Sequence, residues 1–203
     1  MCLIKNQINL MNNTTNTANS NMDEIVDCKK YDNIVINKDN VISKNDTGVI
    51  NSLDSIEEII NLIKNIDFRP SWDEYFIIIS YLISKRSTCN RLQVGCVITK
   101  NNRIVTTGYN GFISGTPHVG VVRDNHEQMT IHAETNAIAD AAKRGVSLSD
   151  STAYITHFPC INCCKVLIAS GIKSIIYGND YKNDELVFLL CEKGEVSIKK
   201  FLK

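Results

Sequence analysis

The chain has 203 residues, of which 22 are Lys or Arg and 22 are Asp or Glu, so its formal net charge at pH 7 is zero. This length suits one domain with appendages and is sufficient to bury a hydrophobic core. The balanced charge and the shortness of the apolar runs predict neither a stable nucleic-acid partner nor a membrane span.

The amino-terminal quarter differs in composition from the rest. Residues 1–50 are rich in Asn, Asp, Ser and Thr without a hydrophobic period, so we expect a disordered or weakly structured extension. Its first ten residues, MCLIKNQINL, lead into polar sequence without a small-residue cleavage site, which predicts no secretory signal and a cytoplasmic location. In that reducing compartment, eight cysteines are expected to be thiols or metal ligands.

Residues 51–68 are expected to form an amphipathic helix and a linker, because leucine and isoleucine recur there at helical spacing. A folded domain is expected over residues 69–203. It opens with a capping box, Ser71 followed by Glu74, at the start of an apolar helix that runs to about Lys85.

The remaining elements alternate in type along the chain. The β-rich runs 94–99 and 103–109 are expected to form a hairpin, and a long loop covers 110–129. After it we expect a helix over about 131–145, a strand over 151–157, a helix over 160–170, a strand over 172–178, a helix over 183–194 and a short strand over 195–201. This order predicts an α/β fold, a three-layer α/β/α sandwich with a central mixed sheet.

The segment TIHAETNAIA, residues 130–139, places His132 and Glu134 at the start of an apolar helix. Taken alone, the pair could be a polar cap with a solvent-facing Glu. Residues two apart lie about 200° apart around a helix axis, so these side chains cannot both address a site on the helix flank. Both can reach a site that lies off the amino-terminal end of the helix.

The segment HFPCINCC, residues 157–164, carries two further ligands. Cys160 and Cys163 lie three residues apart at a helix start, where the helix dipole favours thiolates. Alone, this spacing could also mark a redox dithiol or two core cysteines. Together with His132 the set fits a catalytic zinc site, which has three protein ligands and leaves its fourth position to water. Zinc is then expected between two helix amino termini, with Glu134 as the proton shuttle.

The order H-x-E and then P-C-x-x-C is typical of zinc nucleobase deaminases, in which a zinc-activated water attacks the carbon that carries an exocyclic amine. A non-catalytic zinc module is the alternative from a different class of protein. Structural zinc sites usually have four protein ligands, and no fourth Cys or His falls at a convincing spacing here. The sequence therefore predicts an enzyme with one catalytic zinc.

Five stretches resemble deoxycytidylate (dCMP) deaminases, members of the cytidine deaminase-like superfamily. They are RPSWDEYF (69–76), SKRSTCNRLQVGCVI (84–98), GYNGFISGTPH (108–118), IHAETNAI (131–138) and YITHFPCINCCK (154–165). The resemblance implies zinc-dependent hydrolysis of dCMP to dUMP and ammonia, which feeds thymidylate synthesis. Deamination of another cytosine nucleotide or nucleoside, such as dCTP or deoxycytidine, stays an alternative, and a nucleic-acid cytosine or adenine deaminase is a more distant one.

The resemblance also implies a set of substrate contacts. The Ala133 backbone amide would bind the base carbonyl, and the Asn110 side-chain amide would bind the sugar. The Phe158 ring would lie near the base, and His118 would line the pocket.

The resemblance implies phosphate contacts just before the first strand. Arg86, Ser87 and Thr88 would bind the phosphate, although that stretch alone is also an ordinary basic helix end.

Cofactors and partners follow from the same resemblance. Some bacterial and phage relatives hold a second, structural zinc in the loop before the H-x-E helix, but residues 112–130 contain no cysteine, so we expect no such ion. Family members are often hexamers that dCTP activates and dTTP inhibits together with Mg²⁺. The resemblance therefore implies a small nucleotide substrate and a homo-oligomer, and it leaves open a hexamer, Mg²⁺ and the dCTP and dTTP effectors.

Overall fold

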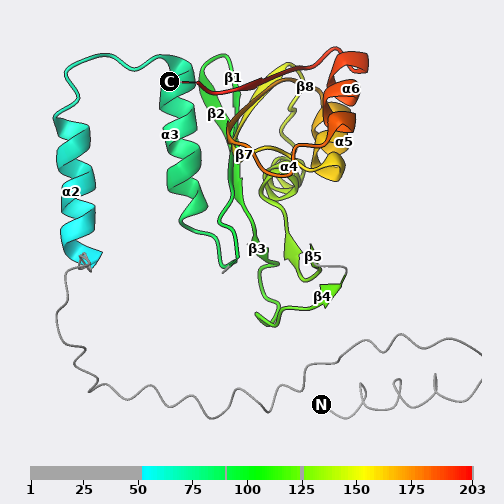
Figure 1. Cartoon of the computed structure of the whole chain (residues 1–203), viewed down its shortest axis with the longest axis horizontal. Helices are drawn as coiled ribbons and strands as arrows, with labels where there is room; N and C mark the ends of the chain where they lie inside the picture. Colours follow the sequence, from blue (N-terminus) through cyan, green and yellow to red (C-terminus); the bar gives the residue numbers. More distant parts are fainter. Residues whose placement is uncertain (1–51, 90, 124–125, 203) are drawn as a thin grey trace, which may run out of the picture. The chain divides into compact units, whose positions relative to one another are not determined.

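The computed structural model describes residues 52–89, 91–123 and 126–202, and the predicted extension over 1–50 lies outside them. A compact unit runs from Ile56 to the carboxyl end (Figure 1). The helices of the described residues are α2 (Ser52–Lys64), α3 (Trp72–Ser84), α4 (Ala133–Lys143), α5 (Ile161–Ala169) and α6 (Glu185–Lys193). Within these residues, no helix is both long enough and apolar enough to cross a membrane.

Five strands form the central sheet, in the order β2-β1-β7-β8-β9. They are β1 (Gly95–Lys100), β2 (Arg103–Tyr109), β7 (Ser151–His157), β8 (Ile172–Asn179) and β9 (Ser197–Lys200). Strand β1 is antiparallel to β2 and β7, whereas β7, β8 and β9 are parallel, so the sheet is mixed as expected. The predicted hairpin is confirmed: Asn101 and Asn102 form its turn with φ of 51° and 56°, a region that asparagine tolerates.

Helices cover both faces of this sheet, which confirms the predicted α/β layers (Figure 1). On one face, buried residues of α3 pack with Val97, Tyr154 and Ile176. On the other face, α4, α5 and α6 contribute to a larger core that includes Ala153 and Ile155. Successive residues of β7 therefore alternate between the two cores, as the pleat of a strand requires.

Helix α4 lies directly against β2, and this contact sets where the helix begins. A Cβ added to Gly108 would come within 2.2 Å of the Ala133 carbonyl oxygen and 2.5 Å of the Ala137 nitrogen, so only glycine allows this approach. The Asn136 side-chain amide also donates to the Tyr109 carbonyl at 2.9 Å. The first turn of α4 is thereby fixed at the carboxyl end of β2.

The loop over 110–129 and the two residues that follow it contain structure that the sequence did not predict. Two-residue strands β3 (Gly111–Phe112) and β6 (Thr130–Ile131) pair with each other, as do β4 (Val122–Arg123) and β5 (His126–Glu127). Strands this short carry no hydrophobic period from which they could be recognised.

Candidate active site

Two helices begin side by side with residues that the sequence marked as metal ligands. His132 is the N-cap of α4 and Cys160 is the N-cap of α5, both with extended backbones, at φ −72° and ψ 154° and at φ −70° and ψ 162°. Neither side chain caps its helix through a hydrogen bond within the described residues. Both side chains project beyond the helix ends, where the sequence placed the site.

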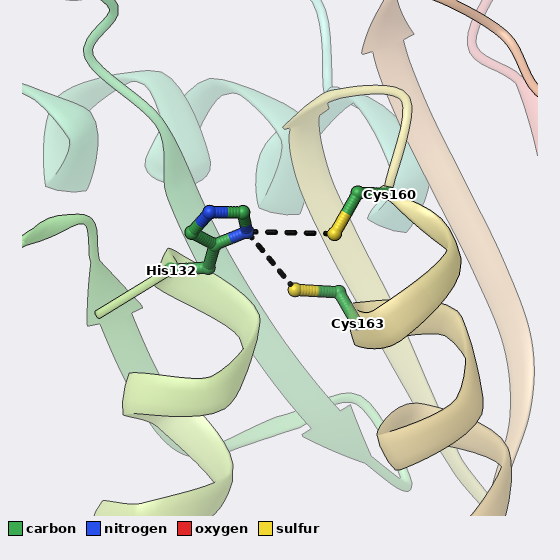
Figure 2. Close-up of side chains that lie close together, drawn as sticks. All are labelled: His132, Cys160 and Cys163. Carbon is green, nitrogen blue, oxygen red and sulfur yellow. Dashed lines mark hydrogen bonds between the residues drawn. The ribbon is translucent and has the colours of Figure 1, made fainter. Parts of the chain in front are cut away.

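Three ligand atoms converge between these helix starts, as Figure 2 shows. The His132 Nδ1 lies 3.5 Å from the Cys160 Sγ and 3.4 Å from the Cys163 Sγ, and all three atoms lie within 4.8 Å of one another. A tetrahedral zinc with nitrogen at ~2.05 Å and sulfur at ~2.3 Å separates the nitrogen from each sulfur by ~3.5 Å. Both observed nitrogen–sulfur distances therefore match a zinc site.

The two sulfurs differ in their affinity for protons. Hydrogen bonds from Cys163 and His132 lower the pKa of Cys160 to about 3, whereas the shared hydrogen bond and burial raise the pKa of Cys163. The hydrogen bond to Cys160 also raises the pKa of His132. These opposite shifts favour a thiolate at Cys160 rather than at Cys163, and the Thr135 hydroxyl lies 3.7 Å from the Cys163 sulfur.

Glu134 lies in the first turn of α4 with only 4% of its surface exposed. Burial is the main cause that raises the pKa of its carboxyl group. A carboxyl that is shielded from water and has a raised pKa holds a proton more readily than an exposed one, which suits a group that both accepts and returns a proton in general acid–base chemistry. It lines the same pocket as His132 and Cys160.

This pocket contains several of the residues that the sequence singled out, including Asn110, Ala133 and Phe158. A cavity of about 770 Å³ lies elsewhere, between the start of α3 and the β1–β2 hairpin, and no predicted site residue lines it. Convergent ionisable groups, rather than size, therefore identify the site. The pocket is also lined by Arg91, His157 and Tyr181, which the sequence analysis did not single out.

The amide of Asn110 mainly organises the chain around the pocket. Its Nδ2 donates to the Leu92 carbonyl at 2.7 Å, and its Oδ1 accepts from the Val94 N–H at 2.8 Å and the Ser87 hydroxyl at 2.7 Å. One Nδ2 hydrogen is left for a ligand, so the sugar contact stays a prediction. Ser87 supports Asn110 rather than lining the pocket.

The remaining predicted phosphate and pocket residues lie further out. Arg86 is exposed and is not among the pocket residues. Thr88 and His118 line an adjoining pocket, where the His118 ring stacks on Phe112 at 4.8 Å between centroids. Arg91 is exposed and lines both pockets, and among the described residues that line them no other is a lysine or an arginine.

One signal in the sequence could have identified His157. Ala153 and Ile155 face the core under α4 and α5, so the alternation of β7 puts His157 on that same face. No such period covers the irregular stretch around Arg91. Cys164 is not one of the three ligands: its Sγ lies 3.7 Å from the Cys191 Sγ of α6.

A family model described as the cytidine and deoxycytidylate deaminase zinc-binding region matches residues 70–179, more than half of the chain. The chain belongs to this deaminase family. Every predicted metal ligand, together with Glu134, falls inside the matched region of this deaminase.

Individual relatives agree with that assignment. ComE operon protein 2 of Bacillus subtilis is 42% identical to this deaminase over 136 residues, which are 65% of the chain and 72% of that protein. Deoxycytidylate deaminase of Saccharomyces cerevisiae is 34% identical over 143 residues, which cover 66% of the chain and about half, 46%, of the yeast protein. The crystal structure of the cyanophage S-TIM5 dCMP deaminase in complex with dCMP and dUMP matches with a TM-score of 0.60 and 29% identity, covering 66% of this chain and 99% of that one.

Proposed function

We propose that this protein catalyses the hydrolytic deamination of dCMP to dUMP, releases ammonia, and so supplies dUMP for thymidylate synthesis. The observation that carries the proposal is the similarity to the cyanophage enzyme, solved with dCMP and dUMP, over 99% of that enzyme's length. The buried carboxyl and the three convergent ligand atoms give this chain the groups that such a reaction needs.

His132, Cys160 and Cys163 would hold one zinc ion. When bound, zinc lowers the pKa of a water in its open position, so that a nucleophile for the C4 carbon of cytosine is available at neutral pH. The carboxylate of Glu134 would take one proton from the attacking water and pass it to the ring nitrogen of the base. It would then move the second proton of that water, from the new hydroxyl on C4, to the departing amine, which leaves as ammonia. The buried position of Glu134 keeps bulk water from exchanging this proton during the reaction.

The two helix starts would orient the base. The first N–H groups of an α-helix lack partners within the helix, so the Ala133 amide is available to the carbonyl oxygen of cytosine. The dipoles of α4 and α5 also place partial positive charge at the site, which stabilises thiolates and a polarised carbonyl. Phe158 lines the pocket and contacts Tyr177 edge-on at 5.0 Å between centroids, so its ring is held as a fixed wall.

Arg91 would bind the phosphate of the nucleotide. Guanidinium groups suit phosphate because they donate two parallel hydrogen bonds, and Arg91 is the arginine that lines the pocket. This cation favours a nucleotide over a free nucleoside. We further propose a cytoplasmic homo-oligomer with a single zinc per chain, and we leave open a hexamer, Mg²⁺ and control by dCTP or dTTP.

Ammonia release from a substrate panel tests the function. We expect the zinc-loaded protein to release ammonia from dCMP faster than from CMP, dCTP, deoxycytidine or single-stranded DNA. Glu134→Gln should lose about 10²- to 10⁴-fold in turnover while keeping its zinc and its fold, because only the proton transfer is removed. Preference for deoxycytidine or for DNA, or near-normal turnover by Glu134→Gln, would overturn the proposal.

The two arginines allow a matched comparison in the same assay. Arg91→Ala should lower kcat/KM for dCMP by about 10- to 100-fold, the effect of losing a hydrogen bond to a charged group, with little change for deoxycytidine. Arg86→Ala, which removes an exposed arginine outside the pocket, should change neither value appreciably. The reverse pattern would restore the phosphate role to Arg86.

A further inference from the structure

His157 is the last residue of β7, and the chemistry proposed above assigns it no role. Its side chain is half-buried and lines the pocket with His132, Glu134 and Tyr181. It precedes Cys160 by three residues, so the strand end that leads into the metal-binding helix also carries this imidazole.

The neighbour of His157 determines which ring nitrogen carries the proton. The Thr156 hydroxyl is fully buried and has two polar contacts within the described residues. It accepts from the Gly95 N–H at 3.1 Å and lies 2.9 Å from the His157 Nδ1. Its own hydrogen needs an acceptor, since a buried donor without a partner costs about 1–3 kcal/mol. The Nδ1 is the available acceptor, so the proton of the neutral ring is on Nε2.

The Nε2–H of His157 is therefore a donor held ready for a ligand. Burial lowers the pKa of His157, which favours the neutral ring in this tautomer. Across the described residues, Nε2 has no hydrogen-bond partner. The ring is also fixed from the side, because Tyr181 contacts it edge-on at 6.2 Å between centroids.

The position of His157 in the pocket determines which part of the substrate its side chain can contact. Glu134 marks the closed end of the pocket, with 4% exposure, whereas Tyr181, with 36% exposure, and Arg91 are among the exposed residues that line it. The base must enter first to reach Glu134, so the sugar and phosphate lie toward exposed lining residues such as these. Positive charge also lies near Tyr181, since the Lys182 Nζ lies 5.8 Å from the centre of the Tyr181 ring. A phosphate offers only acceptor oxygens, which match a fixed N–H donor.

We propose that His157 is a specificity-determining residue, whose Nε2–H donates a hydrogen bond to the 5′-phosphate of the bound nucleotide. Thr156 is a positioning residue, since its hydroxyl fixes the tautomer without touching the substrate. The inference rests on the proposed function and deepens it: His157 and Arg91 together distinguish a nucleotide from a nucleoside.

The experiment measures kcat/KM for dCMP and deoxycytidine in the zinc-loaded protein. His157→Phe keeps an aromatic ring but removes the donor, and it should lower kcat/KM for dCMP by about 10- to 100-fold with deoxycytidine changed by less than about twofold. His157→Gln, whose amide reaches as far as Nε2, should recover part of the loss, whereas the shorter His157→Asn should not. Binding of dUMP, measured by calorimetry, should weaken in the same order.

The outcomes separate the two proposals. If wild-type protein releases no ammonia from dCMP, the proposed function fails. If wild type is active but His157→Phe leaves dCMP unaffected, or weakens both substrates equally, the phosphate contact is wrong. Zinc content and melting temperature are measured on each variant, and the His157→Gln and His157→Asn pair makes the same comparison should His157→Phe fail to fold.

Discussion

The four helices around the sheet begin in two different ways. Helices α3 and α6 start with side-chain caps: the Ser71 Oγ accepts from the Glu74 N–H at 3.2 Å, and the Asp184 Oδ1 accepts from the Leu186 N–H at 2.9 Å. Helices α4 and α5 start with His132 and Cys160, which make no such bond within the described residues. The capped starts satisfy their own N–H groups, and the uncapped starts leave theirs to ligands.

This difference has an energetic consequence. Replacing a good N-cap residue by a poor one costs roughly 0.5–2 kcal/mol, so two uncapped helices are a measurable loss for a domain of this size. A metal that binds the folded state but not the unfolded one raises the free energy of unfolding by mass action, which offsets this loss. The site is therefore expected to make the fold depend on zinc, whereas the capped helices are independent of it.

The largest expected effect comes from giving α4 an ordinary cap. His132→Asn introduces one of the best N-cap residues while it removes a predicted zinc ligand. We expect loss of zinc and loss of ammonia release by at least about 10²-fold, since the nucleophile depends on the metal. In the presence of a chelator, the variant should be more stable than wild type by about 0.5–1 kcal/mol in urea unfolding.

Unfolding in the presence of a chelator tests whether His132 lowers the stability of the metal-free helix α4. A metal-free variant that is less stable than metal-free wild type would show that the imidazole supports the helix start by another route. Retention of stoichiometric zinc would remove His132 from the ligand set.

A smaller effect on stability is expected at α3, whose amino-terminal end is already capped. Ser71→Ala removes both the acceptor for Glu74 and one half of the capping box, so the free energy of unfolding should fall by about 1 kcal/mol. Zinc content and kcat/KM per folded molecule should stay at wild-type values. Ser71→Asp, which keeps an acceptor, is the matched control; a change in kcat/KM in Ser71→Ala alone would contradict the separation of the two kinds of helix start.

The smallest expected effect is a pH dependence of stability that arises from Asp73 in α3. Burial raises the pKa of Asp73, but hydrogen bonds from Lys199 and Tyr154 outweigh it and hold the pKa below the ordinary 3.8. A lowered pKa in the folded state stabilises the fold above 3.8, and this stabilisation is lost as the pH falls through the lower, folded-state value.

Asp73→Asn should therefore melt at a lower temperature than wild type near pH 7, and the difference should shrink as the pH is lowered below 3.8. The difference is small because the ion pair is partly exposed, and such pairs contribute at most about 1 kcal/mol. A difference that grows at low pH would show that the ionised carboxylate destabilises the fold.

The sequence identified those parts of the molecule that local rules determine. The capping box at Ser71, the hairpin turn and the alternation of helices and strands follow from spacing over a few residues. The site off the two helix starts followed from the geometric conflict between His132 and Glu134. The pairing of β3 with β6 could not be predicted, because two-residue strands form through tertiary contact rather than through a pattern.

The sequence also could not show which of two arginines, Arg86 or Arg91, lines the pocket. Both arginines lie in one irregular stretch after α3, and neither composition nor spacing distinguishes them. The Asn110 amide, which comes from a different strand end, holds the chain next to Arg91 through Leu92 and Val94, whereas the Arg86 N–H bonds to the Ile83 carbonyl at the end of α3. Information of this kind is contained in the assembled fold and not in any short segment.

The distribution of charge along the pocket has a consequence for how a ligand arrives. An acidic group, Glu134, is buried at the closed end, and a cation, Arg91, is exposed at the rim. A molecule that carries its negative charge at one end is turned by this field during its approach, so that its neutral end points inward before any contact forms. The encounter is thereby biased toward the productive orientation, and salt should slow it by screening the rim more than the interior.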